Sequence, residues 1–300
     1  MRGSLAIVGA GRVGRVLGRR LHELGWKIGT VVTRSDASAR RAARFIGAGR
    51  PHGGLTRLVL NCEAILVATP DSAVRGVAEE LVRIGAEELR GKIVLHTSGA
   101  LDASALDAVR AFGAAAGSMH PLQSFSGVGV PQLEGRTFAI EGDPPALRMA
   151  RQMVRALGGA PVPIDGGKKP RYHAAAAMAA GHVLAVVEAA ARLLMSIGMN
   201  RREAVRALLP LTRQVLQNFE RLGPRAAWTG PLARGDYEIL GAHTKALRDA
   251  PKEFSEAYEA VNRLAALVLA QDPTGTLMEL NKSSGNKSVK ARAKAAGGNA

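Results

Sequence analysis

Three glycines near the start of the chain have the spacing of a phosphate-binding turn. Gly9, Gly11 and Gly14 form a G-x-G-x-x-G pattern directly after the apolar run at residues 5–8. In such a turn the first glycine permits a tight bend, the second lets the backbone approach a pyrophosphate, and the third lets the next helix pack on the sheet. The pattern predicts a dinucleotide site formed by Gly9, Ala10, Gly11, Arg12, Val13 and Gly14. A glycine turn of purely structural use is the alternative.

The residues after the second expected strand indicate which dinucleotide would bind. A site for NAD places Asp or Glu about 20 residues past the glycines, on the ribose 2′-hydroxyl. This chain instead has Thr33, Arg34 and Ser35, followed by Arg40 and Arg41. A guanidinium suits a 2′-phosphate, so the sequence favours NADP(H). The alternatives are an arginine on an exposed turn, and a looped turn that brings Asp36 back to the ribose.

Two further turns follow expected strands and should face the same edge of the sheet. Thr69 and Pro70 follow the apolar strand at 64–68, and Ser98 and Gly99 follow the strand at 92–97. Ligands of open α/β sheets bind at the carboxyl ends of the strands. We therefore expect these four residues to contact the cofactor, and the Ser98 hydroxyl also to donate a hydrogen bond during the reaction.

Two histidines are candidates for the acid of a hydride-transfer reaction. His120 is expected on a loop at the same sheet edge, and His173 lies at the start of a long alanine-rich helix. A histidine can protonate the oxygen or nitrogen that gains charge as a hydride arrives, because its pKa lies near neutral. The alternative for His120 is a loop histidine that is hydrogen-bonded to a backbone carbonyl.

The second half of the chain has two further polar features. His182 follows His173 by nine positions, which on a regular helix puts it on nearly the opposite face, so the two are not expected in one site of one subunit. A core histidine is the favoured interpretation of His182 alone, and binding to substrate is the other. In the loop at 229–236, Arg234 could hold a carboxylate or phosphate of the substrate, with Thr229 and Asp236 beside it. A connecting turn with an Arg–Asp pair is the alternative.

The elements that would position these residues change in type near residue 166. Strands and helices alternate before it, which predicts an α/β fold with a doubly wound parallel Rossmann sheet at 1–166. Residues 167–275 have a helical pattern with breaks near 198–200, 223–224 and 251, and predict an all-α domain for substrate binding and dimerisation. Residues 276–300 are basic and without apolar periodicity, which predicts a disordered tail.

Composition excludes several classes of protein. The net charge is +16, but the basic residues are scattered and aromatic residues make up only 4%, so we expect no nucleic-acid partner. No metal-ligand spacing is found. Cys62 is the only cysteine, which fits a reducing compartment. The longest apolar stretch, at 174–187, is expected to be too short and alanine-rich to span a bilayer. These features predict a cytoplasmic protein that contacts no membrane.

The motifs together resemble a known superfamily, the pyrroline-5-carboxylate reductase-like and 6-phosphogluconate dehydrogenase C-terminal-like proteins. Within it, the chain is most similar to the Rossmann-like oxidoreductase family with a C-terminal domain of unknown function. The resemblance rests on the glycine turn and on residues 98–100, 120–125, 172–176 and 229–236, and covers roughly residues 4 to 270. It implies an oxidoreductase fold, NADP(H), and a homodimer whose helical domains form the active-site cleft with the Rossmann domain. It implies no particular substrate.

One departure from the resembling proteins concerns the long helix. The family usually carries an asparagine where this chain has His182, and related hydroxyacid dehydrogenases use a Lys and an Asn four residues apart there. We expect no such pair here, because Lys168 and Lys169 are placed in the linker before the helix. Either His182 takes the role of the asparagine, or the chemistry differs from those dehydrogenases.

These observations predict an NADP(H)-dependent oxidoreductase that transfers a hydride to or from a small, anionic C=N or C=O compound. His120, His173 and Ser98 are the expected catalytic residues, and Arg234 is the expected substrate anchor. A non-catalytic NADP(H)-binding regulator or sensor is the alternative, because a fold by itself does not specify a function.

Overall fold

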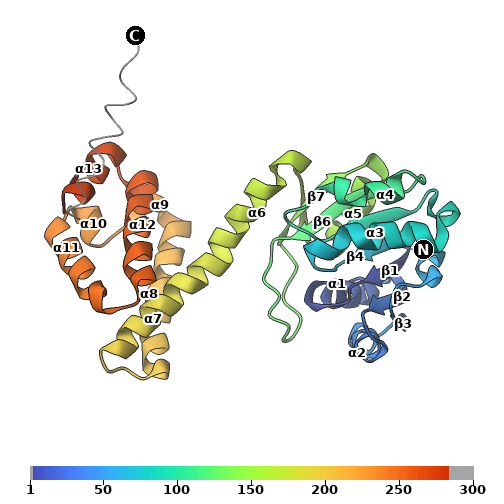
Figure 1. The fold of residues 1–300 in the computed structure, drawn as a ribbon, viewed down its shortest axis with the longest axis horizontal. Helices are drawn as coiled ribbons and strands as arrows, with labels where there is room; N and C mark the ends of the chain where they lie inside the picture. The colour runs from blue at the N-terminus through green and yellow to red at the C-terminus, as the bar shows by residue number, and fades with distance from the viewer. Residues whose placement is uncertain (1–2, 284–300) are drawn as a thin grey trace, which may run out of the picture. The chain divides into compact units, whose positions relative to one another are not determined.

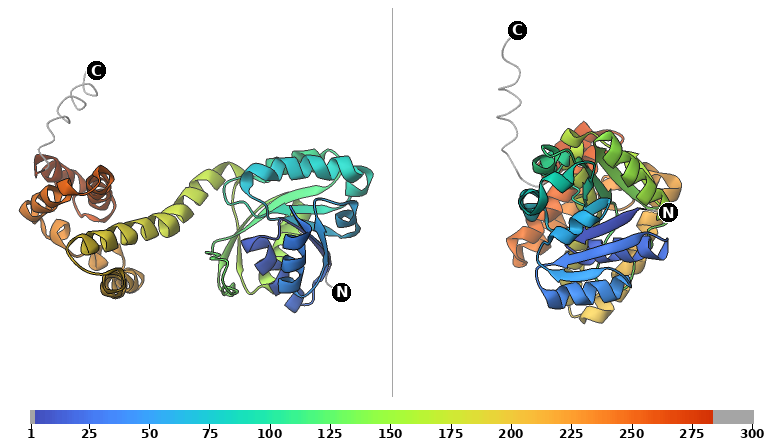
Figure 2. Two further views of the ribbon diagram at one scale, coloured as in Figure 1. Left: turned by 60° about the horizontal axis from the view of Figure 1, so that its bottom comes forward. Right: turned by 90° about the vertical axis from the view of Figure 1, so that its right-hand side faces the viewer.

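The computed structural model describes residues 3–283. The chain divides into two compact units, Met1–His182 and Val183–Ala300, and the division falls later than residue 166. The first unit contains one eight-stranded sheet with helices on both of its faces (Figures 1 and 2). The strands are β1 Ser4–Val8, β2 Lys27–Thr33, β3 Arg50–Gly53, β4 Ala64–Val67, β5 Ile93–His96, β6 Ala115–Pro121, β7 Thr137–Gly142 and β8 Ala160–Pro163. The helices are α1 Arg12–Glu23, α2 Asp36–Ile46, α3 Asp71–Gly85, α4 Asp107–Arg110, α5 Pro144–Ala156 and α6 Lys169–Ala177.

The sheet has the doubly wound order that the sequence predicts. The strands lie in the order β3-β2-β1-β4-β5-β6-β7-β8, so the chain reverses its direction across the sheet between β1 and β4. Neighbouring strands run parallel except β6 and β7, which pair antiparallel. The carboxyl ends of β1, β4, β5 and β6 therefore meet at one edge, because Val8 pairs with Val67, Val67 with His96, and His96 with Ser118.

Two apolar layers enclose this sheet because its strand residues alternate between faces. Leu5 and Ile7 of β1 pack with α1, α2 and α5, whereas Ala6 and Val8 pack with α3 and α4. Strands buried on both faces are nearly continuous in apolar residues, which is why the sequence predicts β1 and β4 so clearly. By contrast, β3 and β6 were not predicted, since the sequences RPHG and AAGSMHP contain no β-branched residue.

The second unit is helical throughout the residues that the structure describes. Its α-helices are α7 Val183–Ser196, α8 Arg201–Leu222, α9 Pro224–Ala227, α10 Pro231–Arg234, α11 Tyr237–Ala246, α12 Lys252–Leu269 and α13 Pro273–Ser283. The breaks fall where the sequence predicts them: Asn200 and Glu203 form a capping box at the start of α8, and Gly223 ends it with φ +81°. Helix α13 shows that the predicted tail begins too early. The remaining tail, 284–300, lies outside the described residues.

A continuous helical stretch passes from the first unit into the second. An 18-residue window within Gly166–Ser196 has a mean hydropathy of 1.6, and 6% of that window is buried within the chain. By length and composition alone, this helix could cross a membrane. The helix is thus longer than the apolar run at 174–187 on which the expectation about a bilayer rests. It includes a π-helical turn, Met178–His182, between α6 and α7. Because this turn changes the helical register, the regular-helix estimate for His173 and His182 does not apply.

Candidate functional site

A cavity of about 960 Å³ opens at the carboxyl edge of the sheet, beside the glycine turn. Of the predicted cofactor residues, those that line it are Gly9, Ala10, Gly11, Thr33, Arg34, Ser35, Thr69 and Pro70. Arg12, Val13, Gly14, Ser98 and Gly99 do not. Arg15, Ser38 and Glu80 also line the cavity. They could not be predicted, because nothing in their spacing separates them from ordinary helix-surface residues.

Two of the three glycines of the turn, Gly9 and Gly14, have the steric roles that the motif predicts. Gly9 has φ +86°, and a Cβ there would lie 2.7 Å from the backbone nitrogen of Thr69. A Cβ on Gly14 would lie 2.7 Å from the Gly9 carbonyl oxygen, so only glycine lets α1 pack this closely. A Cβ on Gly11, by contrast, would have no neighbour nearer than the Gly9 carbonyl oxygen at 4.0 Å. A ligand can therefore approach the Gly11 backbone from the cavity.

The residues of this cavity fit a dinucleotide. The first turn of α1 begins at Arg12 behind Gly11, and the N–H groups of a helix's first turn have no partner within the helix. The Thr69 hydroxyl is buried in the cavity wall and has no hydrogen-bond partner. Because an unpaired buried hydroxyl is unfavourable, both features indicate a polar ligand such as a pyrophosphate and its riboses.

The end of the cavity at β2 carries cations and hydroxyls. Arg34 and Ser35 line it together with Ser38 and Arg41, and Arg41 donates to the Ser38 Oγ at 2.9 Å. Asp36 does not line the cavity: its carboxylate accepts the Gly53 N–H at 2.7 Å and thereby joins α2 to β3. The looped turn that would bring Asp36 to the ribose is therefore not formed.

Further along the same edge, a lysine lies fully enclosed under the turn after β5. Lys169 has no exposed surface, and its Nζ donates to the Ser98 carbonyl at 2.9 Å and to the Ser118 Oγ at 2.7 Å. Ser118 donates to Glu141 at 3.2 Å, and Glu141 accepts the Ala103 N–H at 2.9 Å. This chain of bonds connects α6, β6, β7 and the turn that follows β5.

Lys169 also corrects the expectation about the long helix. Helix α6 begins at Lys169 rather than after it, and Lys168 belongs to the preceding 3₁₀ turn. Lys169 and His173 are therefore four residues apart on one helix, the spacing at which side chains lie on the same face. Sequence alone could not distinguish the two lysines. In the structure, Lys168 is largely exposed and Lys169 is buried.

The Ser98 side chain stabilises its own turn. Its Oγ accepts the N–H groups of Ala100 at 3.1 Å and Leu101 at 3.0 Å, and the residue is 5% exposed. Beneath it, the buried His96 accepts the Ser98 N–H on Nδ1 and donates from Nε2 to the Asp102 carbonyl. This geometry gives Ser98 a structural role, and the donation to substrate that the sequence predicts stays a prediction, because both of these bonds are accepted by Oγ.

Two imidazoles converge on Gly99, which is buried in this turn. A Cβ on Gly99 would lie 2.4 Å from Nδ1 of His173 and 2.8 Å from Nε2 of His120. The two rings meet edge to face, with centroids 5.7 Å apart. The sequence predicts His120 on a loop, but the residue lies on strand β6. Its Nδ1 is 2.8 Å from the Tyr172 hydroxyl. The structure therefore brings the two candidate acids together.

Burial sets the protonation states of this cluster. Burial, the nearby His173 and the charge of Lys169 lower the pKa of His120 to about 4, and burial and Lys169 do the same for His96. Burial lowers the pKa of Lys169 to about 8, although Glu141, Asp102 and Asp71 oppose this shift. At pH 7 the imidazoles of His120 and His96 are therefore neutral, and Lys169 carries most of a positive charge.

The predicted substrate residues of the second half of the chain do not form a cluster of this kind. Arg234 pairs with Asp236 at 2.9 Å, and both side chains are well exposed. This is the Arg–Asp turn that the sequence analysis kept as an alternative. Thr229 is exposed, and so is His182, which excludes the core position favoured for it within the chain.

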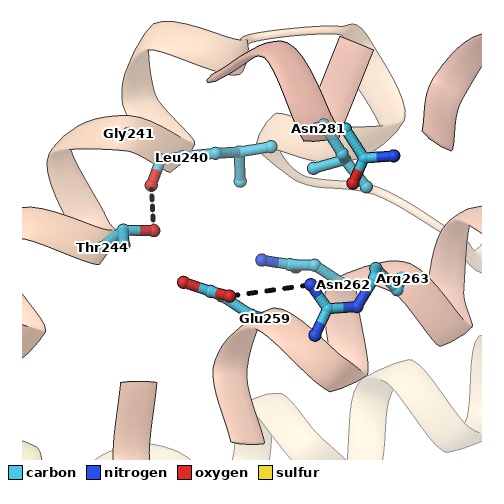
Figure 3. A pocket seen from close by; sticks show the side chains of 8 residues that line it. Leu240, Gly241, Thr244, Glu259, Asn262, Arg263 and Asn281 are labelled. Atoms are coloured by element: carbon cyan, nitrogen blue, oxygen red, sulfur yellow. Dashed lines mark hydrogen bonds and ion pairs between the residues drawn. The ribbon is translucent and has the colours of Figure 1, made fainter. Parts of the chain in front are cut away.

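The second unit has two hollows that could be taken for sites. The pocket in Figure 3 lies between α11, α12 and α13 and encloses about 30 Å³, which is close to the volume of one water. Its wall includes the Glu259–Arg263 ion pair at 3.6 Å. A larger hollow of about 440 Å³ lies beside Trp228 and Tyr237. None of the predicted substrate residues lines either of them.

Known domain families match both halves of the chain. A Rossmann-like domain matches residues 1–121, and a domain of unknown function, DUF2520, matches residues 136–265. The chain thus carries a Rossmann-like domain followed by a DUF2520 domain. This confirms the family resemblance drawn from the motifs. No curated protein matches the sequence.

Solved structures share this fold at low sequence identity. A Bacteroides fragilis protein provisionally described as an NADP oxidoreductase is 22% identical, with a TM-score of 0.73 over 88% of this chain and 97% of its own. A reductive aminase from Aspergillus terreus, solved with NADPH4, cyclohexanone and allyl amine, is 17% identical, with a TM-score of 0.63 over 88% and 94%. A pyrroline-5-carboxylate reductase from Coxiella burnetii is 14% identical, with a TM-score of 0.58 over 90% and 100%.

The burial of His96 predicts a loss of stability in mild acid. Because the folded protein keeps this imidazole neutral to a lower pH than the unfolded chain does, the unfolded state binds the proton first. The free energy of unfolding should therefore fall as the pH falls from about 6.5 to about 4. Asparagine does not titrate in this range. In His96→Asn the free energy of unfolding should therefore fall less than in the wild type, and the difference should reach up to about 3 kcal/mol. Urea unfolding across this range measures both slopes.

The same substitution at the exposed His243 serves as the control for replacing a histidine that the fold does not enclose. A His96→Asn slope equal to that of the wild type would show that His96 binds a proton equally well in both states.

Proposed function

We propose that the protein is an NADP(H)-dependent oxidoreductase that transfers a hydride to or from a small C=N or C=O compound. The observation that carries the proposal is the continuity of one sheet edge. The glycine turn and the Thr69 hydroxyl line the cavity after β1 and β4, and the His120–His173 pair lies against Gly99 in the turn after β5, with His120 on β6. In the sheet, β1 and β6 are separated by three strand spacings, or about 14 Å. The described ligands and activities of the structural neighbours support the same class of reaction.

The proposed cofactor is NADP(H), held by residues that the cavity already presents. The backbone of the glycine turn and the first turn of α1 would bind the pyrophosphate, and Arg34, Ser35 and Arg41 would bind the 2′-phosphate. When bound, the nicotinamide supplies the hydride. The protein's own part is to position the acceptor carbon and to stabilise charge on the neighbouring oxygen or nitrogen.

Charge on the oxygen or nitrogen would be stabilised by the residues around Gly99, namely His120, His173 and Lys169. His120 would donate a hydrogen bond to the heteroatom, and the buried charge of Lys169 would stabilise the negative charge that develops there. Lys169 also holds the Ser98 carbonyl, so that the turn keeps its position. His173, with its buried and unpartnered Nδ1, is the second candidate contact for the substrate.

The charge of the substrate remains a prediction from composition. The net charge of +16 favours an anionic compound. Arg234 supports this less than the sequence suggests, because its guanidinium already pairs with Asp236.

The cofactor assignment is tested by comparing two neighbouring arginines. Arg34→Ala should weaken NADPH binding about ten- to a hundredfold and leave NADH binding nearly unchanged, because only NADPH carries the 2′-phosphate. Arg40→Ala is the matched control, since Arg40 is exposed on the same helix as Arg41 but does not line the cavity. Calorimetric titration of both nucleotides measures these affinities. An equal loss for both nucleotides in Arg34→Ala would remove the case for NADP(H).

Catalysis is tested by turnover of NADPH with imines, keto acids and aldehydes. His120→Ala should lower kcat about a hundredfold or more and leave NADPH affinity unchanged. The exposed His182→Ala, assayed beside it, tests whether that residue contributes to substrate binding. If the wild type binds NADPH but turns over none of these compounds, and His120→Ala changes nothing, the protein is the regulator or sensor that the sequence analysis kept as the alternative.

We further propose that a second copy covers the apolar surface of the helical unit, giving a cytoplasmic homodimer. Apolar side chains are exposed along α7 and α8: Val183, Leu184, Val186, Leu211, Val215, Leu216, Phe219 and Leu222. A patch of this kind marks an interface. The alanine density of α6 allows close approach of another helix.

This assembly predicts a soluble dimer by light scattering. Leu184→Asp should yield monomers, because Leu184 is 69% exposed and would place a carboxylate in the interface. Val128→Asp is the control: Val128 is 86% exposed in the first unit and should not affect assembly. A monomeric wild type would contradict the dimer. Recovery of the wild type with the membrane fraction would contradict the cytoplasmic location as well.

A further inference from the structure

Tyr172 forms a specific contact with His120 that the proposed chemistry has not yet used. The Tyr172 hydroxyl lies 2.8 Å from Nδ1 of His120, and the two rings meet edge to face with centroids 5.5 Å apart. Tyr172 comes from the first turns of α6, whereas His120 comes from β6. Among the described residues the hydroxyl has no second hydrogen-bond partner. Its direction is therefore set by His120 alone.

In this contact the phenol is the donor. Burial raises the pKa of Tyr172 to about 12, so the hydroxyl keeps its proton at all ordinary pH values. The lone pair of an imidazole nitrogen is more basic than that of a phenol oxygen, so O–H···N is the stronger arrangement of the pair. A neutral imidazole carries one proton, and which nitrogen holds it follows from the bond that the other nitrogen makes. With Nδ1 accepting, the proton of His120 is on Nε2.

The protonated Nε2 faces the turn at Gly99. A Cβ on Gly99 would lie 2.8 Å from Nε2, so the absence of a side chain there leaves the N–H unobstructed. Nε2 has no protein partner among the described residues, and it is not among the polar atoms that are sealed from solvent without one. This N–H is therefore a fixed donor that a small molecule can reach.

We propose that Tyr172 is a positioning residue whose hydroxyl fixes the tautomer of His120, so that the neutral ring presents Nε2–H to the substrate heteroatom. The inference rests on the proposed function, because only that function supplies the substrate heteroatom that accepts the hydrogen bond from Nε2–H. It also narrows the class of substrate. A carbonyl oxygen or a neutral imine nitrogen has a lone pair to accept the bond, whereas a fully substituted iminium ion has none.

The surroundings of His120 keep its ring neutral, as this role requires. His173 and Lys169 on α6 and His96 on β5 oppose a second proton on the ring, and burial opposes it most of all. Asp71 at the start of α3 acts in the opposite sense and does not outweigh them, so the pKa lies at about 4. The donor should therefore stay unchanged across the range in which an unperturbed histidine titrates.

The experiment is nitrogen NMR of the full chain with ¹⁵N-labelled histidine rings. In the wild type at pH 7, His120 should show a proton-free Nδ1 and a protonated Nε2, with the signals assigned by their loss in His120→Gln. In Tyr172→Phe, which removes only the hydroxyl, the two signals should move toward each other as both tautomers become populated. The kcat of NADPH-dependent turnover of a carbonyl substrate should fall about tenfold, with NADPH affinity unchanged.

The chain offers a matched control pair in the second unit. His243 Nδ1 lies 2.7 Å from the Tyr258 hydroxyl, again edge to face, but His243 is exposed. Tyr258→Phe should leave the His120 signals and the turnover unchanged. A protonated Nδ1 on His120 in the wild type, or His120 signals in Tyr172→Phe identical to those of the wild type, would overturn the proposal. If the signals behave as expected but no substrate is turned over, the proposed function fails while the role of Tyr172 on the ring stands.

Discussion

An ammonium group with no exposed surface has to be hydrogen-bonded on every side that the fold allows, and the bonds of Lys169 organise this sheet edge. They reach the Ser98 carbonyl and the Ser118 hydroxyl, and Ser118 passes the connection to Glu141. Removing any partner would leave a buried charge or polar atom without compensation, which is more costly than losing the bond itself. The turn that carries Gly99 is thereby held in place by the bond from Lys169 to the Ser98 carbonyl.

The same enclosed charge determines how the neighbouring groups behave. Burial next to a cation keeps His96 and His120 neutral, and it leaves the Glu141 carboxylate as the nearest anion on this chain of bonds. Burial raises the pKa of Glu141, but the charge of Lys169 and the bonds from Ser118 and Ala103 act against that shift. The cluster thus combines the buried positive charge of Lys169 with the neutral imidazole of His120. This arrangement suits reactions in which charge appears on a substrate atom.

The parts of this site that could be predicted from sequence are those where the backbone dictates the residue. The G-x-G-x-x-G turn is recognisable because Gly9 and Gly14 leave no room for a Cβ. Strands β1 and β4 are recognisable because strands covered on both faces are apolar throughout. Tyr172 and Lys169 escaped prediction for the opposite reason. Their importance comes from residues about 50 to 70 positions away in the chain, namely His120, Ser118 and Ser98. No local pattern separates Lys169 from Lys168, and only the start of α6 at Lys169 decides which of them is enclosed.

One small contact has a consequence for how this cofactor site could change over evolution. Asp36, the acidic residue nearest to the end of β2, holds the Gly53 N–H and so fastens the edge strand β3 to helix α2. Its carboxylate is therefore not available to bind a ligand in the cavity. A lineage that turned toward a cofactor without the 2′-phosphate would have to recruit a new carboxylate while keeping this one. The sheet border thus limits which residue of this turn can set the cofactor preference.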